Sequence, residues 1–76
     1  MGINVREYVL QQIKLPAEVP DDTNYRKIGA VDSLGLVRLI LTLETKFGIM
    51  FEDTDVSKPE FNTVGGLVKI IEKKLA

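Results

Sequence analysis

The residue best suited to carry chemistry is Ser33, which follows Asp32 at the predicted start of a helix. The first turn of a helix has unpaired backbone N–H groups and the positive end of the helix dipole, so it stabilises a bound or covalently attached phosphate. The chain contains no histidine and no cysteine. Neither a Ser-His-Asp arrangement nor a thiolate nucleophile can therefore form. We expect Ser33 to be a tether that another enzyme modifies, and the chain to have no catalytic residue and not to be an enzyme.

The acidic residues Glu52, Asp53 and Asp55 are the other group that could bind a ligand. They lack the twelve-residue ligand spacing and central glycine of a calcium loop. Histidine and cysteine ligands for a transition metal are missing from the composition. We expect a solvated acidic turn here, and no metal site.

Composition limits the protein to a small set of classes. The 76 residues are 45% hydrophobic and 28% charged with a net charge of −1, which predicts one small folded domain over residues 1–76. Nearly neutral charge offers no basic field for nucleic acid. No apolar run approaches the roughly 20 residues of a membrane span, and the N-terminus does not resemble a signal peptide. With no cysteine for disulfides, we expect a cytoplasmic protein, and a monomer.

The segment before Ser33 should contain one helix and one long loop. Ile3 to Lys14 has apolar residues four apart on one face and should end before Pro16. Pro16 to Asp32 is rich in Pro, Gly, Asp and Asn, which predicts an irregular connection. Loops of this length are usually functional or disordered. We expect this one to be held on the bundle by Tyr25 and Ile28, although a partly mobile linker fits the composition equally well.

Ser33 to Phe47 is the clearest predicted helix, with Asp32 as cap and Gly48 just beyond its end. Helical spacing of about 100° per residue sorts its apolar residues into two groups. The stripe expected to face the core is Leu36, Leu39, Ile40, Leu43 and Phe47. The second group lies on another flank of the helix, where a single core could not bury it. This flank consists of Leu34, Val37 and Leu41.

The C-terminal third should complete an all-α fold. Ile49 to Phe61 predicts a loop with one short helix, fixed to the bundle by Phe51, Val56 and Phe61. Asn62 or Thr63 should cap a last helix, whose Gly65 and Gly66 indicate either a close helix contact or, more simply, fraying. Its predicted core residues are Val64, Leu67, Val68, Ile71 and Leu75, with Lys69, Glu72, Lys73 and Lys74 facing water. The predicted fold is a bundle of three principal helices and one minor helix, with a long loop between the first two helices.

These features, in this order, resemble the acyl carrier protein family, which includes peptidyl and aminoacyl carriers. Nearly the whole chain takes part in the resemblance. It rests on Ile28-Gly29-Ala30-Val31-Asp32-Ser33-Leu34, the helix Leu34 to Phe47, Phe47-Gly48-Ile49, the acidic loop from Glu52, and Phe61-Asn62-Thr63-Val64 before the last helix.

The resemblance implies a covalent cofactor and a set of partners. Ser33 would carry phosphopantetheine, donated by coenzyme A through a phosphopantetheinyl transferase that Asp32 helps to recognise. The thiol of the arm would hold cargo as a thioester, delivered by a loading ligase and passed to transferases or synthases. Partner enzymes would dock on the exposed flank formed by Leu34, Val37, Arg38 and Leu41. A role of Asp32 as a helix cap is compatible with this, and the three apolar residues could instead pack under the loop or be scattered on the surface.

One departure from the family bears on the pathway. Carriers of fatty-acid synthesis are typically acidic on the helix after the serine, whereas this helix contains Arg38 and Lys46. Together with Lys58-Pro59-Glu60-Phe61-Asn62-Thr63, this favours a specialised stand-alone carrier, for an amino acid such as D-alanine or for a dedicated polyketide, peptide or lipid pathway. The alternative from another class is a non-modified adaptor that binds a partner helix through Leu34, Val37 and Leu41.

Overall fold

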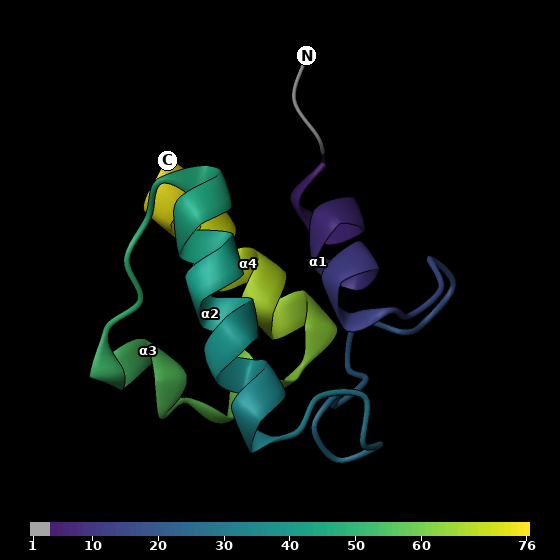
Figure 1. Cartoon of the computed structure of the whole chain (residues 1–76). Coiled ribbons are helices and arrows are strands. Elements are labelled where there is room, and N and C mark those ends of the chain that lie inside the picture. Colours follow the sequence, from purple (N-terminus) through teal and green to yellow (C-terminus); the bar gives the residue numbers. More distant parts are fainter. Residues whose placement is uncertain (1–3) are drawn as a thin grey trace.

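The fold is a helical bundle, as predicted, and the computed structural model describes residues 4–76 of it (Figure 1). Its helices are α1 (Val5–Ile13), α2 (Ser33–Phe47), α3 (Asp53–Val56), the 3-10 helix η1 (Pro59–Asn62) and α4 (Val64–Leu75). The only β-type pairing in residues 4–76 is an isolated bridge between Asn24 and Thr63. None of the described helices is both long and apolar enough to cross a membrane.

Helix α1 begins after the polar cap Asn4, which was not predicted, and ends before Pro16, as expected. The Asn4 side chain accepts a hydrogen bond from the Glu7 N–H at 3.2 Å, and Lys14 ends the helix in the left-handed conformation with φ 59°. Ile3, the predicted first residue, lies outside the described residues. The helix buries Leu10 as well as Val9 and Ile13, so its apolar face is wider than the four-residue spacing indicated.

The long loop is attached to the bundle at several points. Of the two predicted alternatives, these contacts support a loop held on the bundle rather than a partly mobile linker. Arg6 donates to Asp21 Oδ1 at 2.9 Å and to the carbonyls of Ala17 and Val19 at 3.0 and 2.7 Å. Tyr25 is fully buried and its hydroxyl donates to the Phe61 carbonyl. Burial raises the pKa of Tyr25 well above its usual range, against a smaller opposing effect of the neighbouring Arg26 charge. The hydroxyl therefore stays protonated and remains a donor.

The prediction that Ile28 also holds the loop is wrong, because its side chain is 59% exposed. The chain makes a tight turn here, in which the N–H groups of Ala30 and Val31 both donate to the Tyr25 carbonyl at 3.0 and 3.2 Å. The turn carries Ile28 outward and brings Val31 into the core instead.

The core lies where α1, α2 and α4 meet. Leu36, Leu39 and Leu43 of α2 are buried, and Ile40 and Phe47 are partly buried against them, as the predicted stripe required. From α4 the core receives Val64, Leu67, Val68 and Ile71. The prediction for Leu75 is wrong: it is 47% exposed, because it ends α4 one turn beyond Ile71, past the packed part of the bundle.

The paired glycines of α4 mark close backbone approach, so the prediction of fraying is wrong. A Cβ atom on Gly65 would lie 2.6 Å from Asp21 Cβ, and one on Gly66 would lie 2.0 Å from the Glu60 carbonyl oxygen. Thr63, one of the two predicted caps, accepts a hydrogen bond from the Gly66 N–H at 3.1 Å. The loop and η1 can reach the start of α4 only because both positions lack a side chain.

The connection from α2 to α4 contains two short helices, α3 and η1, where one was predicted. Phe51 packs edge-on against the buried Phe61, with ring centroids 5.3 Å apart. Asp55 is more than part of a solvated turn, because its Oδ2 lies 2.8 Å from Lys74 Nζ and also 2.8 Å from the Glu52 N–H. Lys74 was expected to face water, and it instead ties the end of α4 to α3.

Candidate functional site

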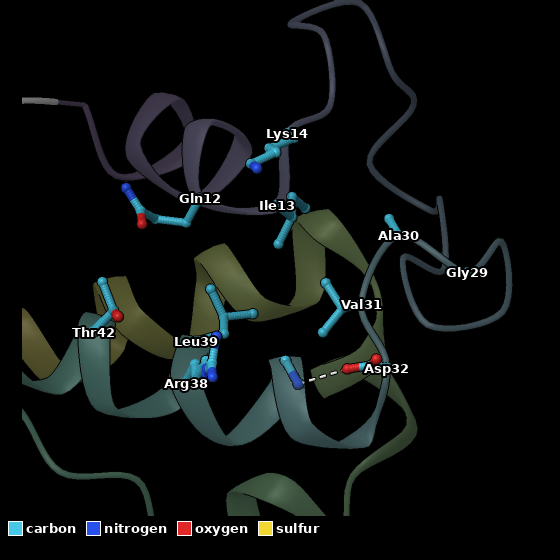
Figure 2. Close-up of a pocket in the computed structure, with 11 residues that line it drawn as sticks. Gln12, Ile13, Lys14, Gly29, Ala30, Val31, Asp32, Arg38, Leu39 and Thr42 are labelled. Atoms are coloured by element: carbon cyan, nitrogen blue, oxygen red, sulfur yellow. Dashed lines mark hydrogen bonds between the residues drawn. The ribbon is translucent and has the colours of Figure 1, made fainter.

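Asp32 determines where α2 starts and how Ser33 is presented. Its Oδ1 accepts the Gly35 N–H at 2.6 Å (Figure 2). Its backbone is extended, and its carbonyl accepts the Leu36 N–H at 2.8 Å. Ser33 is therefore the first helical residue, with an exposed side chain. The predicted cap is confirmed, and Ser33 lies neither in the core nor in the middle of a helix.

The first turn of α2 keeps backbone donors that the first turn of α4 does not. In α4, the N–H groups of Val64 and Gly65 donate to loop carbonyls at 3.0 and 2.7 Å. In α2, the N–H groups of Ser33 and Leu34 have no protein acceptor among residues 4–76. Two donors at the positive end of a fifteen-residue helix thus remain available beside the serine hydroxyl.

A shallow hollow beside Ser33 has cations on its rim that sequence reasoning did not identify. It is lined by Asn24, Arg26, Lys27, Val31, Asp32, Ser33 and Asn62. The Asn24 side chain accepts the N–H groups of Arg26 and Lys27 at 3.1 and 2.9 Å, which holds both residues at the turn. Asn62 reaches the hollow because its carbonyl accepts the Tyr25 N–H at 3.1 Å. An asparagine in a breaker-rich loop is a sequence signal for such a turn. No local signal predicts that the turn lies next to Ser33.

The predicted flank of α2 is exposed. Leu34, Val37 and Leu41 have exposed fractions of 64%, 53% and 59%, and Arg38 is exposed as well. Helical geometry places the four side chains within about 100° of one another around the α2 axis. They therefore form one continuous surface that starts beside Ser33, and the apolar residues do not pack under the loop.

This arrangement fits an anionic group attached covalently and gives no means of turnover. Arg26 and Lys27 line the same hollow as the exposed Ser33, and two N–H groups of the first turn of α2 have no acceptor within residues 4–76. Asp32, the carboxylate of the hollow, is occupied as the cap of α2. The phosphodiester of a phosphopantetheine arm has the charge and the acceptor oxygens that such donors bind. When bound, the group supplies a thiol that holds an acyl group as a thioester.

Comparison with known proteins gives one consistent answer. Residues 4–71 match the family described as the phosphopantetheine attachment site. The acyl carrier protein of Wolinella succinogenes is 34% identical over 70 residues, covering 91% of this chain and 90% of that protein. That of Thermotoga maritima is 42% identical over 64 residues, covering 84% and 69%. That of a Sulfurovum species is 36% identical over 70 residues, covering 91% of both.

The family match extends over most of the chain and agrees with the helical fold. Members of this family bear a covalently attached phosphopantetheine group, are modified by a phosphopantetheinyl transferase and serve acyl-handling enzymes. They carry intermediates and do not catalyse reactions, in agreement with a chain that has no histidine or cysteine. The chain thus belongs to the acyl carrier protein family and is a phosphopantetheine-bearing carrier.

Proposed function

We propose that Ser33 bears the arm and that this chain tethers acyl intermediates there for delivery to partner enzymes. The observation that carries the proposal is the position of Ser33 as the exposed first residue of α2, behind the Asp32 cap. In the attachment step, a bond forms between Ser33 Oγ and the β-phosphorus of coenzyme A, and the pyrophosphate linkage breaks. Adenosine 3′,5′-bisphosphate leaves, and the hydroxyl proton passes to a base of the transferase, since this chain has no histidine to accept it.

Asp32 has two roles in this proposal. Its Oδ1 fixes the first turn of α2 through the Gly35 N–H, and its exposed carboxylate is a feature that a transferase can recognise next to Ser33. A flexible arm then makes each partner's active site an intramolecular destination, which raises the local concentration of cargo without catalysis by the carrier.

The exposed flank of α2, formed by Leu34, Val37, Arg38 and Leu41, is the proposed docking surface. Apolar side chains this exposed contribute nothing to the core, but burying them against a partner would be favourable at about 25 cal/mol per Å² of apolar surface. Because the flank begins next to Ser33, a partner bound there would have the arm at the edge of the contact.

We propose that this chain is a stand-alone carrier that serves one dedicated acyl pathway. Glu44 is the one carboxylate within α2; it is partly buried and accepts the Phe51 N–H at 2.8 Å. The exposed flank instead presents Arg38. A basic synthase surface would gain little electrostatic attraction from such a helix. Location in the cytoplasm, a monomeric state and one carrier domain over residues 1–76 remain predictions.

The test uses the two serines of the chain, Ser33 and Ser57. The apo protein is incubated with coenzyme A and a broad-specificity phosphopantetheinyl transferase, and its intact mass is recorded. We expect the mass of one arm to be added to the wild type and to Ser57→Ala, and none to Ser33→Ala. Ser57 is a matched control because it is also exposed, but it follows a four-residue helix and donates its hydroxyl to the Thr54 carbonyl. Uptake by Ser33→Ala would refute the assignment. No uptake by the wild type, with partner binding retained in Ser33→Ala, would favour an adaptor.

A further inference from the structure

The segment that contains Ser33 has the opposite net charge to the rest of the chain. Residues 26–46 contain four basic and two acidic side chains, a net charge of +2, although the whole chain has a net charge of −1. The residues outside this segment therefore carry −3. The basic residues of the segment are Arg26, Lys27, Arg38 and Lys46, and the acidic ones are Asp32 and Glu44. The proposed function does not account for this asymmetry.

Cations lie on both sides of the start of α2. On one side, Arg26 and Lys27 line the hollow already described. On the other side, a depression between α1 and α2 is lined by Lys14 and Arg38 (Figure 2). Asp32 lines both depressions and is the one carboxylate among the described residues that line them. Four cations and one carboxylate therefore border the attachment point.

The four cations are available to a partner. All four side chains are exposed, and neither of the two ion pairs formed within residues 4–76 involves any of them. Of the carboxylates in the segment, Asp32 is engaged as the cap of α2 through the Gly35 N–H. Glu44 is partly buried and accepts the Phe51 N–H. Ion pairs within the described part of the chain therefore do not neutralise the positive charge of this face.

The turn before Ser33 holds two of the cations at a fixed place on the backbone. The Asn24 side chain accepts the N–H groups of Arg26 and Lys27 at 3.1 and 2.9 Å. Tyr25 between them is fully buried, and its N–H donates to a carbonyl of η1 at 3.1 Å. Because this backbone is already ordered, a partner that binds there has less conformational entropy to remove.

The exposed apolar flank of α2 lies beside these cations. Leu34, Val37 and Leu41 form it, and Arg38 borders it at about 40° from Leu34 around the helix axis. An apolar centre with a polar and charged rim is the usual composition of a protein–protein interface. A nucleic acid would pair with the cations but would leave the three apolar side chains in water. The face therefore fits a protein partner.

We propose that the partner protein that docks on this face has an acidic surface around the point where the arm enters it. This deepens the proposed function and rests on attachment at Ser33 and docking at the flank. The flank is buried at the centre of the contact, and carboxylates of the partner lie opposite the four cations. Exposed pairs at a rim add only about 0.2–1 kcal/mol each, whereas complementary fields raise the rate of encounter and reject partners of the wrong charge. The cations therefore select the partner more than they tighten the complex.

The test uses two helical peptides as probes. Both have the same stripe of leucines, bordered by glutamates in one peptide and by lysines in the other. Each is titrated into the isotope-labelled holo chain and followed by NMR at about 10 mM and about 150 mM salt, between which the screening length falls from about 30 Å to about 8 Å. We expect the glutamate peptide to shift the amides of Leu34, Val37 and Leu41. It should bind about five- to tenfold more tightly than the lysine peptide at low salt, and this preference should shrink at the higher salt.

Charge variants identify the residues responsible. The double variant Arg26→Gln, Lys27→Gln and the single variant Arg38→Gln should each reduce the preference by about two- to threefold. Their side chains are exposed, so the fold should be retained. Lys69→Gln is the matched control, because Lys69 is also exposed but lines an acidic depression at the start of α4. It should leave the preference unchanged.

Three results would count against the inference. Equal or tighter binding of the lysine peptide, or a preference that persists in both variants, would overturn it. Sedimentation with phosphatidylglycerol vesicles that is lost in the same variants, without any preference between the peptides, would assign the cations to a lipid surface instead. Failure of both peptides to shift the flank would refute the docking surface. The intact mass of the same sample shows whether Ser33 bears the arm, so failure of the attachment proposal is seen separately.

Discussion

Tyr25→Phe is the substitution that best tests how the loop is held in place before Ser33. Tyr25 is fully buried, and its hydroxyl donates to the carbonyl of Phe61, a residue that is also fully buried. The variant keeps the ring and leaves the carbonyl without a donor, which costs about 1–3 kcal/mol. A chain of this size has a total stability of roughly 4–11 kcal/mol. At about 2 kcal/mol, the melting temperature should fall by about 8–16 °C.

The assay is urea and thermal unfolding of the apo protein, followed by circular dichroism. Tyr8→Phe is the matched control, because Tyr8 is half-buried, packs edge-on against Phe47 at 5.5 Å, and has no hydroxyl hydrogen bond within residues 4–76. The control should change stability by no more than about 0.5 kcal/mol. If Tyr25→Phe were no more destabilising than Tyr8→Phe, the hydrogen bond to η1 would not be what holds the loop.

Three further substitutions test local features. Asp32→Ala removes the α2 cap and should cost about 1 kcal/mol in urea unfolding; an unchanged midpoint would contradict the cap. Gly66→Ala places Cβ 2.0 Å from the Glu60 carbonyl oxygen, so unfolding free energy should fall by about 3 kcal/mol or more; wild-type stability would mean that the approach is not this close. The hydrogen bond from Lys74 lowers the pKa of Asp55 below its ordinary 3.8. Its stabilisation is therefore present above that pH and lost as pH falls below it. The stability advantage of wild type over Asp55→Asn should shrink from about pH 5 toward pH 2, and a constant difference would contradict the pairing.

The helices were predictable because their signals are local. The extent of α2 agrees with the prediction at both ends, since Asp32 supplies the cap and Gly48 adopts the left-handed conformation with φ 64°. Period and spacing also separated the buried stripe of α2 from the exposed flank, and the exposed positions of Leu34, Val37 and Leu41 agree with that division. These features depend on residues only three or four positions apart in the chain. They can therefore be predicted from the sequence alone.

The missed features depend on contacts between distant segments. The glycines at 65 and 66 were interpreted through helix propensity, but the loop at Asp21 and the helix at Glu60 explain them. Ile28 and Val31 are both apolar residues of one loop, and only the turn around the Tyr25 carbonyl determines which of them is buried. A pattern of residue types contains no information about which way an irregular segment turns.

The candidate site also has some features that adjacent residues determine and others that depend on contacts between distant segments. The Asp32 cap and the exposed Ser33 follow from adjacent residues, and both could be predicted. The cations at 26 and 27 belong to the Ser33 hollow only because Tyr25 anchors the loop on η1. A second depression is lined by Ile13 of α1 and Leu39 of α2, which are far apart in the sequence, so no local motif could have indicated it.

The most direct test of the central claim is peptide-level mass spectrometry of the protein purified from its own cell. After proteolysis, the peptide that contains Ser33 should carry one phosphopantetheine group, released on fragmentation, and the peptide that contains Ser57 should be unmodified. The arm on any other residue, or a Ser33 peptide that stays unmodified when the protein is fully active in its cell, would contradict the claim that this serine is the tether.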